Sequence, residues 1–175
     1  PPVPGTPRAR GAAMAAISDR ARIDAEAFEK GGMDGIILEN HGDIPFLKPH
    51  EIGPEIIAAM SAIAVRVGAA IGIPFGINLL ANAAIGSLAI AKASSARFIR
   101  VNQWVNAYIA NEGLIEGESA RPLRYRKQID AGDVATFPGR HVNPGPHRPT
   151  SHTPVAAPAR PPALNDAARA PPPGH

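Results

Sequence analysis

Short apolar runs alternate along this chain with longer segments of helical spacing, and this alternation constrains the fold more than any other feature. The runs are predicted strands at 35–40, 73–80, 97–102 and 133–137. Helices are expected before and between them at 12–30, 54–67, 83–94 and 119–129. Strands separated by single helices are typical of a parallel sheet with crossover connections. The predicted class is therefore α/β, and both an open doubly wound sheet and a barrel fit the pattern.

The ends of these elements carry their own signals. Gly31 and Gly32 predict a left-handed end to the first helix, and Pro54 suits the first turn of the second. Asn82 is expected to cap the third helix, and the segment 103–118 is predicted to be a loop. The apolar face of the first helix is expected to comprise Met14, Ile17, Ala21, Ala25 and Phe28.

The stretch from Val67 to Ala91 carries no charged residue and is long enough to span a bilayer. It is interrupted by glycines, a proline and two asparagines, however. Backbone breaks and amides are costly in lipid, so the stretch is better explained as a buried strand followed by a helix.

Charge is distributed unevenly between two predicted regions. Residues 1–137, the predicted folded domain, hold equal numbers of acidic and basic side chains, so the excess of +3 lies in residues 138–175. A neutral domain does not predict a nucleic-acid partner. The region 138–175 is rich in proline and is predicted to be a disordered tail. The chain has no cysteine, which excludes disulfides and thiol catalysis.

Polar side chains lie at or near the ends of three successive predicted strands. In parallel strand–helix folds, ligands bind where the strands end, and a buried amide is costly without a partner. These groups are therefore expected either to form a ligand site or to satisfy each other in a structural network. They are Glu39 and Asn40 at the end of the first strand, Asn78 within the second and Asn82 just beyond it, and Arg100 and Asn102 at the end of the third.

Strand parity gives Arg100 a particular place. Side chains alternate across a strand, so Ile99 and Val101 should meet the helices while Arg100 and Asn102 face the other way. A guanidinium there needs a carboxylate, and Glu39 is the nearest by topology. Glu112 and Glu116 are the second choice. Such a pair would hold an anionic or polyhydroxyl ligand, or it is a closed structural ion pair.

His41 and Asp43 lie two residues apart beside Gly42. They could supply a general base or two metal ligands, but a turn held by the Asp side chain is the favoured interpretation. Trp104 and Tyr108 would line a pocket or simply pack the loop. The candidate catalytic groups are thus Glu39, Asp43 and Glu112, and the candidate ligand-binding groups are Asn40, Asn78, Asn82, Arg100, Asn102 and Glu116. The residues indicate no metal site and identify no cofactor.

Several segments together resemble one known family. They cover residues 1–137 in order, and they are PPVPGTPR, GGMDGIILENHGDIPF, GINLLANAAIGSLAIAKASSARFIRVN, EGLIEG and LRYRKQI. They are similar to the BtpA/SgcQ family. The resemblance implies a (β/α)8 TIM barrel of the ribulose-phosphate-binding type and a role in photosystem I biogenesis as a factor peripheral to a membrane. An alternative that it leaves open is an enzyme acting on a small phosphorylated sugar or related metabolite.

The chain also departs from the family pattern. Ala81 and Ala83 flank Asn82 where the family tends to have Arg and Asp, and beyond Phe137 only His141 and Val142 match the family's continuation. Family members also usually have a strand ahead of the segment with which this chain starts. The chain is therefore expected to be a member truncated at both ends, or frameshifted, with about half a barrel. The expected partners are a small-molecule ligand, a peripheral membrane or photosystem partner, or a homo-oligomer formed through open sheet edges, and the expected location is cytoplasmic.

Overall fold

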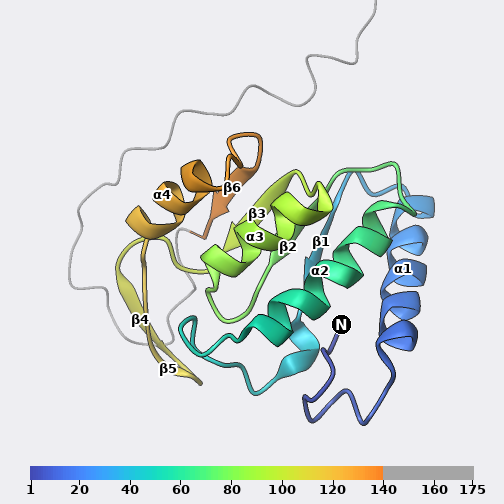
Figure 1. Ribbon diagram of the computed structural model, residues 1–175, viewed down its shortest axis with the longest axis horizontal. Coiled ribbons are helices and arrows are strands. Elements are labelled where there is room, and N and C mark those ends of the chain that lie inside the picture. Colours follow the sequence, from blue (N-terminus) through green and yellow to red (C-terminus); the bar gives the residue numbers. More distant parts are fainter. Residues whose placement is uncertain (140–175) are drawn as a thin grey trace, which may run out of the picture. The chain divides into compact units, whose positions relative to one another are not determined.

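The computed structural model describes residues 1–139. The predicted tail, apart from its first two residues, lies outside the described residues. Helices and strands alternate as expected (Figure 1). The elements are α1 (Met14–Lys30), β1 (Ile36–Glu39), the short 3-10 helix η1 (His41–Asp43), α2 (Pro54–Gly68), β2 (Phe75–Asn78), α3 (Ala84–Ser94), β3 (Phe98–Val101), β4 (Ala107–Ala110), β5 (Gly113–Glu116), α4 (Ala120–Gln128) and β6 (Ala135–Pro138).

The main sheet is parallel and has the strand order β1-β2-β3-β6. The predicted α/β class is therefore confirmed. Each strand is short because a polar residue or a turn follows the apolar run. Within residues 1–139, β1 and β6 are the two edge strands of this sheet.

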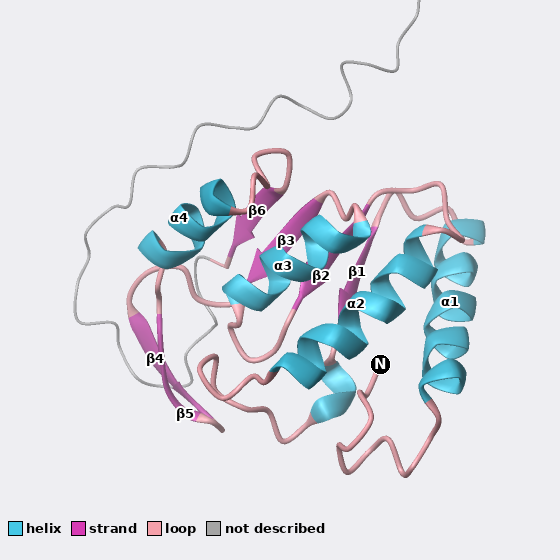
Figure 2. Ribbon diagram, viewed as in Figure 1, coloured by secondary structure: helices cyan, strands magenta, loops and turns pink. Residues whose placement is uncertain are grey.

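The helices form a layer on one face of the sheet, and α2 and α3 lie in front of the strands in Figure 2. The core lies between these layers. Ile77 and Ile99 from the sheet are fully buried, as are Met60 and Ile63 from α2. Ile99 and Val101 therefore face the helices, as strand parity predicts.

The predicted loop at 103–118 is wrong, because it contains the antiparallel hairpin β4–β5. Tyr108 pairs with Ile115 on one face of the hairpin, and Ile115 is buried. Ile109 pairs with Leu114 on the other face, and their side chains are 80% and 54% exposed. Apolar side chains lie on both faces of the hairpin. The sequence therefore lacks the alternation of apolar and polar residues that predicts a half-buried strand.

Two further expectations about helices need correction. Asn82 does not cap α3, because Ala83 occupies the cap position without a side-chain hydrogen bond. Phe28 is 53% exposed and does not belong to the buried face of α1. The left-handed end of α1 is confirmed, and it lies at Gly32, where φ is +84°.

The uncharged stretch from Val67 to Ala91 comprises the end of α2, strand β2 and most of α3. The predicted strand and helix are therefore confirmed. In the part of the chain that the structure describes, no helix has both the length and the apolar character needed to cross a bilayer.

Candidate functional site

Three of the predicted polar residues form one row across the sheet. Glu39 pairs in register with Asn78, and the pairing of Ile77 with Ile99 places Arg100 in the same row. Their side chains share the sheet face that is turned away from the helices. The row lies at the carboxyl ends of β1, β2 and β3, where ligands bind in this class of fold.

Glu39 is the centre of the row. One of its oxygens, Oε1, accepts a hydrogen bond from Nδ2 of Asn78. The same oxygen lies 3.5 Å from Nη1 of Arg100, so the expected ion pair is present. The side chains of Arg100 and Glu39 are 42% and 29% exposed. A half-exposed pair of this kind contributes at most about 1 kcal/mol to stability. Its main effect is therefore on the local charge at the carboxyl ends of the strands.

Two amide oxygens at the strand ends lack partners, one in this row and one on Asn102, just after β3. Oδ1 of Asn78 and Oδ1 of Asn102 are buried and accept no hydrogen bond. Asn78 as a whole is only 1% exposed. A buried acceptor left without a donor costs roughly 1–3 kcal/mol. The polar network at the strand ends is therefore incomplete, and it can accept two hydrogen bonds from a bound molecule.

Asn40 and Asp43 have a different position. Oδ1 of Asn40 accepts a hydrogen bond from the Leu80 N–H at 2.7 Å, and Nδ2 donates to Oδ2 of Asp43 at 2.9 Å and to the Leu80 carbonyl at 3.3 Å. The other Asp43 oxygen accepts from the Val3 N–H at 2.7 Å. These buried bonds join the chain's first residues to the ends of β1 and β2. They support the interpretation of Asp43 as a turn residue, and its catalytic role stays a prediction.

Asn82 also connects strand ends. Its Oδ1 accepts from the Gln103 N–H at 2.8 Å, and its Nδ2 donates to the Glu116 carbonyl at 3.2 Å. Its backbone is left-handed, with φ of 57°, which Asn tolerates well. The Glu116 side chain itself is exposed, so Glu116 contributes its backbone rather than its carboxylate to this connection.

Tyr108 lies on the inner face of the hairpin within electrostatic reach of the row. Burial raises the pKa of Tyr108, the negative charge of Glu112 raises it further, and the positive charge of Arg100 opposes them. The predicted candidate Glu112 is therefore close to Tyr108, although the described residues contain no ion pair between Glu112 and Arg100. A catalytic role for Glu112 stays a prediction.

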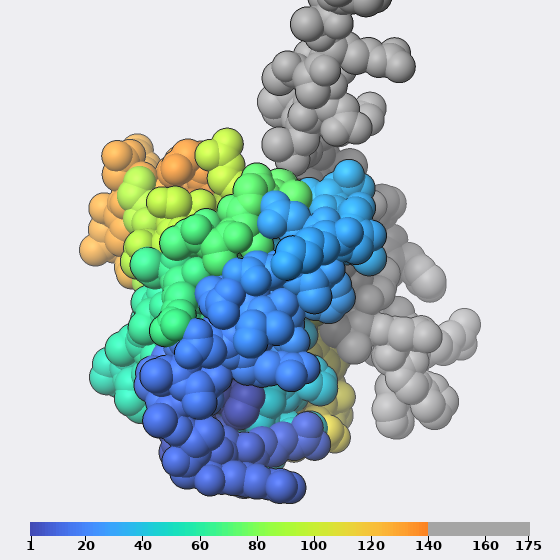
Figure 3. Space-filling model, turned by 90° about the vertical axis from the view of Figure 1, so that its right-hand side faces the viewer, coloured from blue at the N-terminus to red at the C-terminus, as the bar shows by residue number. Residues whose placement is uncertain are grey.

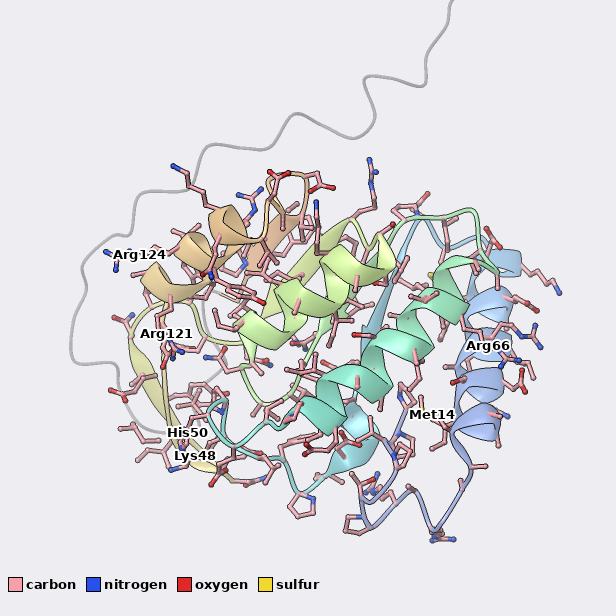
Figure 4. All side chains as sticks on the ribbon, in the orientation of Figure 1. Met14, Lys48, His50, Arg66, Arg121 and Arg124 are labelled. Carbon is pink, nitrogen blue, oxygen red and sulfur yellow. The ribbon has the colours of Figure 1, made fainter. Side chains whose placement is uncertain are left out.

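A small cavity of about 160 Å³ lies beside the amino end of α3. His50, Gln103, Trp104 and Arg121 are among its lining residues, and Trp104 thus lines this cavity. Figure 4 shows Arg121 and Arg124 projecting from α4, with Lys48 and His50 near the hairpin. Sequence analysis missed His50, which does not follow a strand, and Gln103, which comes directly after the predicted strand 97–102 and was assigned to the loop.

A larger cleft of about 580 Å³ runs between α1, β1 and the chain's first residues. Figure 3 views the molecule from the α1 side, where the first residues lie recessed behind the helix. Ala12, Ala16 and Ile17 from the helix side and Ile37 from β1 are among its lining residues. In residues 1–139, no three His, Asp or Glu side chains converge as a metal site requires.

A parallel sheet with its crossover helices on one face defines an α/β fold of the strand–helix repeat type. The chain belongs to the BtpA family, whose family model matches residues 1–148.

Relatives come from distant organisms. An uncharacterised protein of Archaeoglobus fulgidus is 46% identical over 129 residues, which cover 74% of this chain and 51% of the relative. The photosystem I biogenesis protein BtpA of Synechocystis sp. is 39% identical over 136 residues, covering 77% of this chain and 47% of the relative. An uncharacterised mitochondrial protein of Caenorhabditis elegans is 35% identical over 145 residues, covering 78% and 50%.

The chain thus spans about half the length of the curated relatives it matches. No solved structure matches it significantly.

Proposed function

We propose that the row of Glu39, Asn78 and Arg100, together with Asn102 just after β3, binds a small polyhydroxylated metabolite that carries an anionic group. The two buried amide oxygens without partners support this proposal above all else. An unpaired buried acceptor persists where function outweighs its cost, and a hydroxyl donor would satisfy it.

The chemistry of the row narrows the class of ligand. Asn78 and Asn102 each offer an acceptor, which suits two hydroxyl groups of a sugar or polyol. Arg100 directs one long hydrogen bond at Glu39, and a guanidinium has five N–H donors. The remaining donors suit a phosphate or carboxylate. A sugar phosphate therefore fits better than a neutral sugar, and Glu39 is the candidate for proton transfer to or from it.

The proposed architecture is half of a (β/α)8 barrel. The four parallel strands with their helices repeat the unit from which such barrels are built, and the row occupies the rim that carries barrel active sites. We also propose that the protein lies peripheral to a membrane, as the family resemblance implies.

A role in photosystem assembly is the second candidate. It is favoured by the name of the Synechocystis relative, a photosystem I biogenesis protein. The exposed pair Ile109 and Leu114 on the hairpin offers a contact surface for such a partner. Relatives also occur in an animal and an archaeon, however. An activity that they all share would not depend on a photosystem, and a small-molecule ligand meets that condition.

The proposal is tested by thermal shift with ribose 5-phosphate, ribose and inorganic phosphate. A ligand at 100 times its dissociation constant stabilises by about 2.7 kcal/mol, so ribose 5-phosphate should raise the melting temperature of the wild type. Arg100→Ala should weaken the response to ribose 5-phosphate but keep any response to ribose. Asn78→Ala should weaken both.

The matched controls are Arg124→Ala, which removes an exposed arginine on α4, and Asn111→Ala, which removes an exposed asparagine in the hairpin turn. Both should respond as the wild type does. A wild type that responds to none of the three probes would overturn the proposal, as would an equal loss of response in the controls.

A further inference from the structure

The small cavity beside the amino end of α3 is separate from the polar row. Val101 lines the cavity and faces the helices, whereas Arg100 of the row faces the other side of the sheet. The cavity is built by the segments that precede α2, α3 and α4 and by the residues that follow β3. All of these segments lie well inside the described part of the chain.

Most polar side chains around this cavity are satisfied by the protein itself. Glu118 and Arg121 pair with each other at 2.8 Å and, like His50, they are exposed at its mouth. Asn82 is buried, and both polar atoms of its side chain have partners in the backbone. None of these groups therefore needs a ligand.

Gln103 is different, because only one of its two amide atoms has a partner. The residue is 7% exposed and lines the cavity. Its Nε2 donates to the Val105 carbonyl at 2.6 Å. A carbonyl only accepts, so this bond determines which amide atom is the nitrogen. Among the described residues nothing donates to the other atom, Oε1, so a buried acceptor is left for a ligand.

Two backbone N–H groups of α3 complement this acceptor. The helix begins without a side-chain cap. The N–H groups of Ala84 and Ser87 donate to nearby carbonyls, but within residues 1–139 those of Ile85 and Gly86 between them have no acceptor. Ile85 and Gly86 both line the cavity. The cavity therefore offers two donors and one acceptor.

The size and the apolar walls of the cavity restrict what it can hold. Ile52, Ile57 and Trp104 are among its lining residues and pack against the core. Its volume of about 160 Å³ is close to that of an engineered apolar cavity of about 150 Å³ that binds benzene. A single aromatic ring with a small polar substituent therefore fits, and the Trp104 indole offers it an aromatic neighbour.

We propose that this cavity binds a neutral molecule with one planar ring that carries an amide group. The amide carbonyl accepts from the N–H groups of Ile85 and Gly86, and the amide N–H donates to Oε1 of Gln103. A carboxylate of the same shape also suits a helix amino end. Its second oxygen, however, meets Oε1 of Gln103 with no proton between them, which leaves both acceptors unsatisfied. The cavity therefore selects amides over carboxylates.

This site goes beyond the proposed function and does not depend on it. The polar row uses side chains on the sheet face turned away from the helices, whereas the cavity lies on the helix side and uses Gln103 and the backbone of α3. A chain that fails to bind a sugar phosphate can still bind an amide, and the reverse holds as well.

The experiment uses the chain's only tryptophan, Trp104, whose fluorescence reports on the cavity because Trp104 lines it. The full chain is titrated with benzamide, benzoate and toluene, which share one ring and differ in the substituent. Benzamide should change the fluorescence in a saturable way. Its dissociation constant should be at least about tenfold lower than that of benzoate or toluene, because each of these leaves a buried polar group unsatisfied.

Gln103→Met removes the acceptor and keeps the length of the side chain. This variant should bind benzamide at least about tenfold more weakly and toluene as tightly as the wild type does. Gln128→Met is the matched control, since Gln128 is exposed at the end of α4 and does not line the cavity. The control should bind benzamide as the wild type does.

A second variant tests the cavity without changing the bond from Gln103 to Val105. Ile52→Phe places an extra ring in the cavity and should abolish the response to all three probes. Val65→Phe is its control, because Val65 is 51% exposed on α2 and lies outside the cavity lining. A thermal melt of each variant shows that it is folded.

Three results would overturn the inference. The first is a cooperatively folded wild type whose fluorescence shows no saturable response to benzamide. The second is benzoate that binds as tightly as benzamide, which indicates a site for anions. The third is a folded Ile52→Phe variant that keeps the wild-type affinity for benzamide, since the probe would then bind elsewhere.

Discussion

Replacing Asn102 by leucine should stabilise the unliganded protein, although it removes a polar group from the proposed site. Oδ1 of Asn102 is buried and has no hydrogen-bond partner. The native state therefore carries a desolvation cost of roughly 1–3 kcal/mol for this oxygen. Leucine has a similar shape and no buried acceptor. We expect the free energy of unfolding to rise by about 1 kcal/mol, which raises the melting temperature by about 4 °C for a unit of this size.

The same substitution at Asn40 should have the opposite sign. The Asn40 amide makes three buried hydrogen bonds, two to the Leu80 backbone and one to Asp43. Asn40→Leu loses all three and leaves their partners unsatisfied inside the protein. At about 1 kcal/mol for each bond, the expected loss is about 3 kcal/mol or more. The two variants thus test the same Asn→Leu change at an amide oxygen that has a hydrogen-bond donor and at one that has none.

The assay is urea unfolding of the wild type and both variants, followed by circular dichroism, with and without ribose 5-phosphate. Asn102→Leu should move the midpoint to higher urea without ligand and should lose the ligand-induced shift. If Asn102→Leu destabilises the protein as much as Asn40→Leu does, the Asn102 oxygen is satisfied in solution. The reasoning that makes it a ligand contact would then be wrong.

Three other substitutions test separate features. Gly76→Ala should cost about 1–3 kcal/mol, because a Cβ would collide with the Phe98 ring on the open sheet face; urea unfolding measures this. Glu39→Gln should increase the affinity for ribose 5-phosphate in titration calorimetry, because Arg100 loses the carboxylate that neutralises it. Tyr108→Phe should reduce the loss of stability above about pH 10. Burial raises the pKa of Tyr108 above its ordinary value, so the unfolded chain releases that proton first as the pH rises.

The fold was largely predictable because its signals are local. The apolar runs and the helical spacing between them determine the order of elements, and Gly32 marks the end of α1 through its positive φ. The hairpin was missed because its apolar residues alternate on both faces, and only tertiary contact decides that Ile115 is buried while Ile109 is exposed. Phe28 was wrongly assigned to the buried face of α1 for the same reason. Helical spacing does not determine how far along α1 the contact with a neighbouring helix extends.

The candidate site was predictable where strand parity and parallel order act together. They bring Glu39, Asn78 and Arg100 into one row, and the pair between Glu39 and Arg100 follows from that order. Strand parity and parallel order do not distinguish an amide that is hydrogen-bonded to the backbone from one whose oxygen lacks a partner. Asn40 and Asn78 lie at the ends of neighbouring strands, yet the Asn40 oxygen has a donor and the Asn78 oxygen has none. That difference depends on where the Leu80 backbone passes, which sequence patterns do not give.

The unmet hydrogen-bonding capacity at the strand ends consists of two side-chain oxygens, on Asn78 and Asn102. A small molecule with hydroxyl donors would satisfy both, so removal of either oxygen should lower the ligand-induced rise in melting temperature. Asn78→Ala and Asn102→Leu should therefore each reduce that rise. A chain whose melting temperature responds to no such molecule has a polar network that is already satisfied at the strand ends.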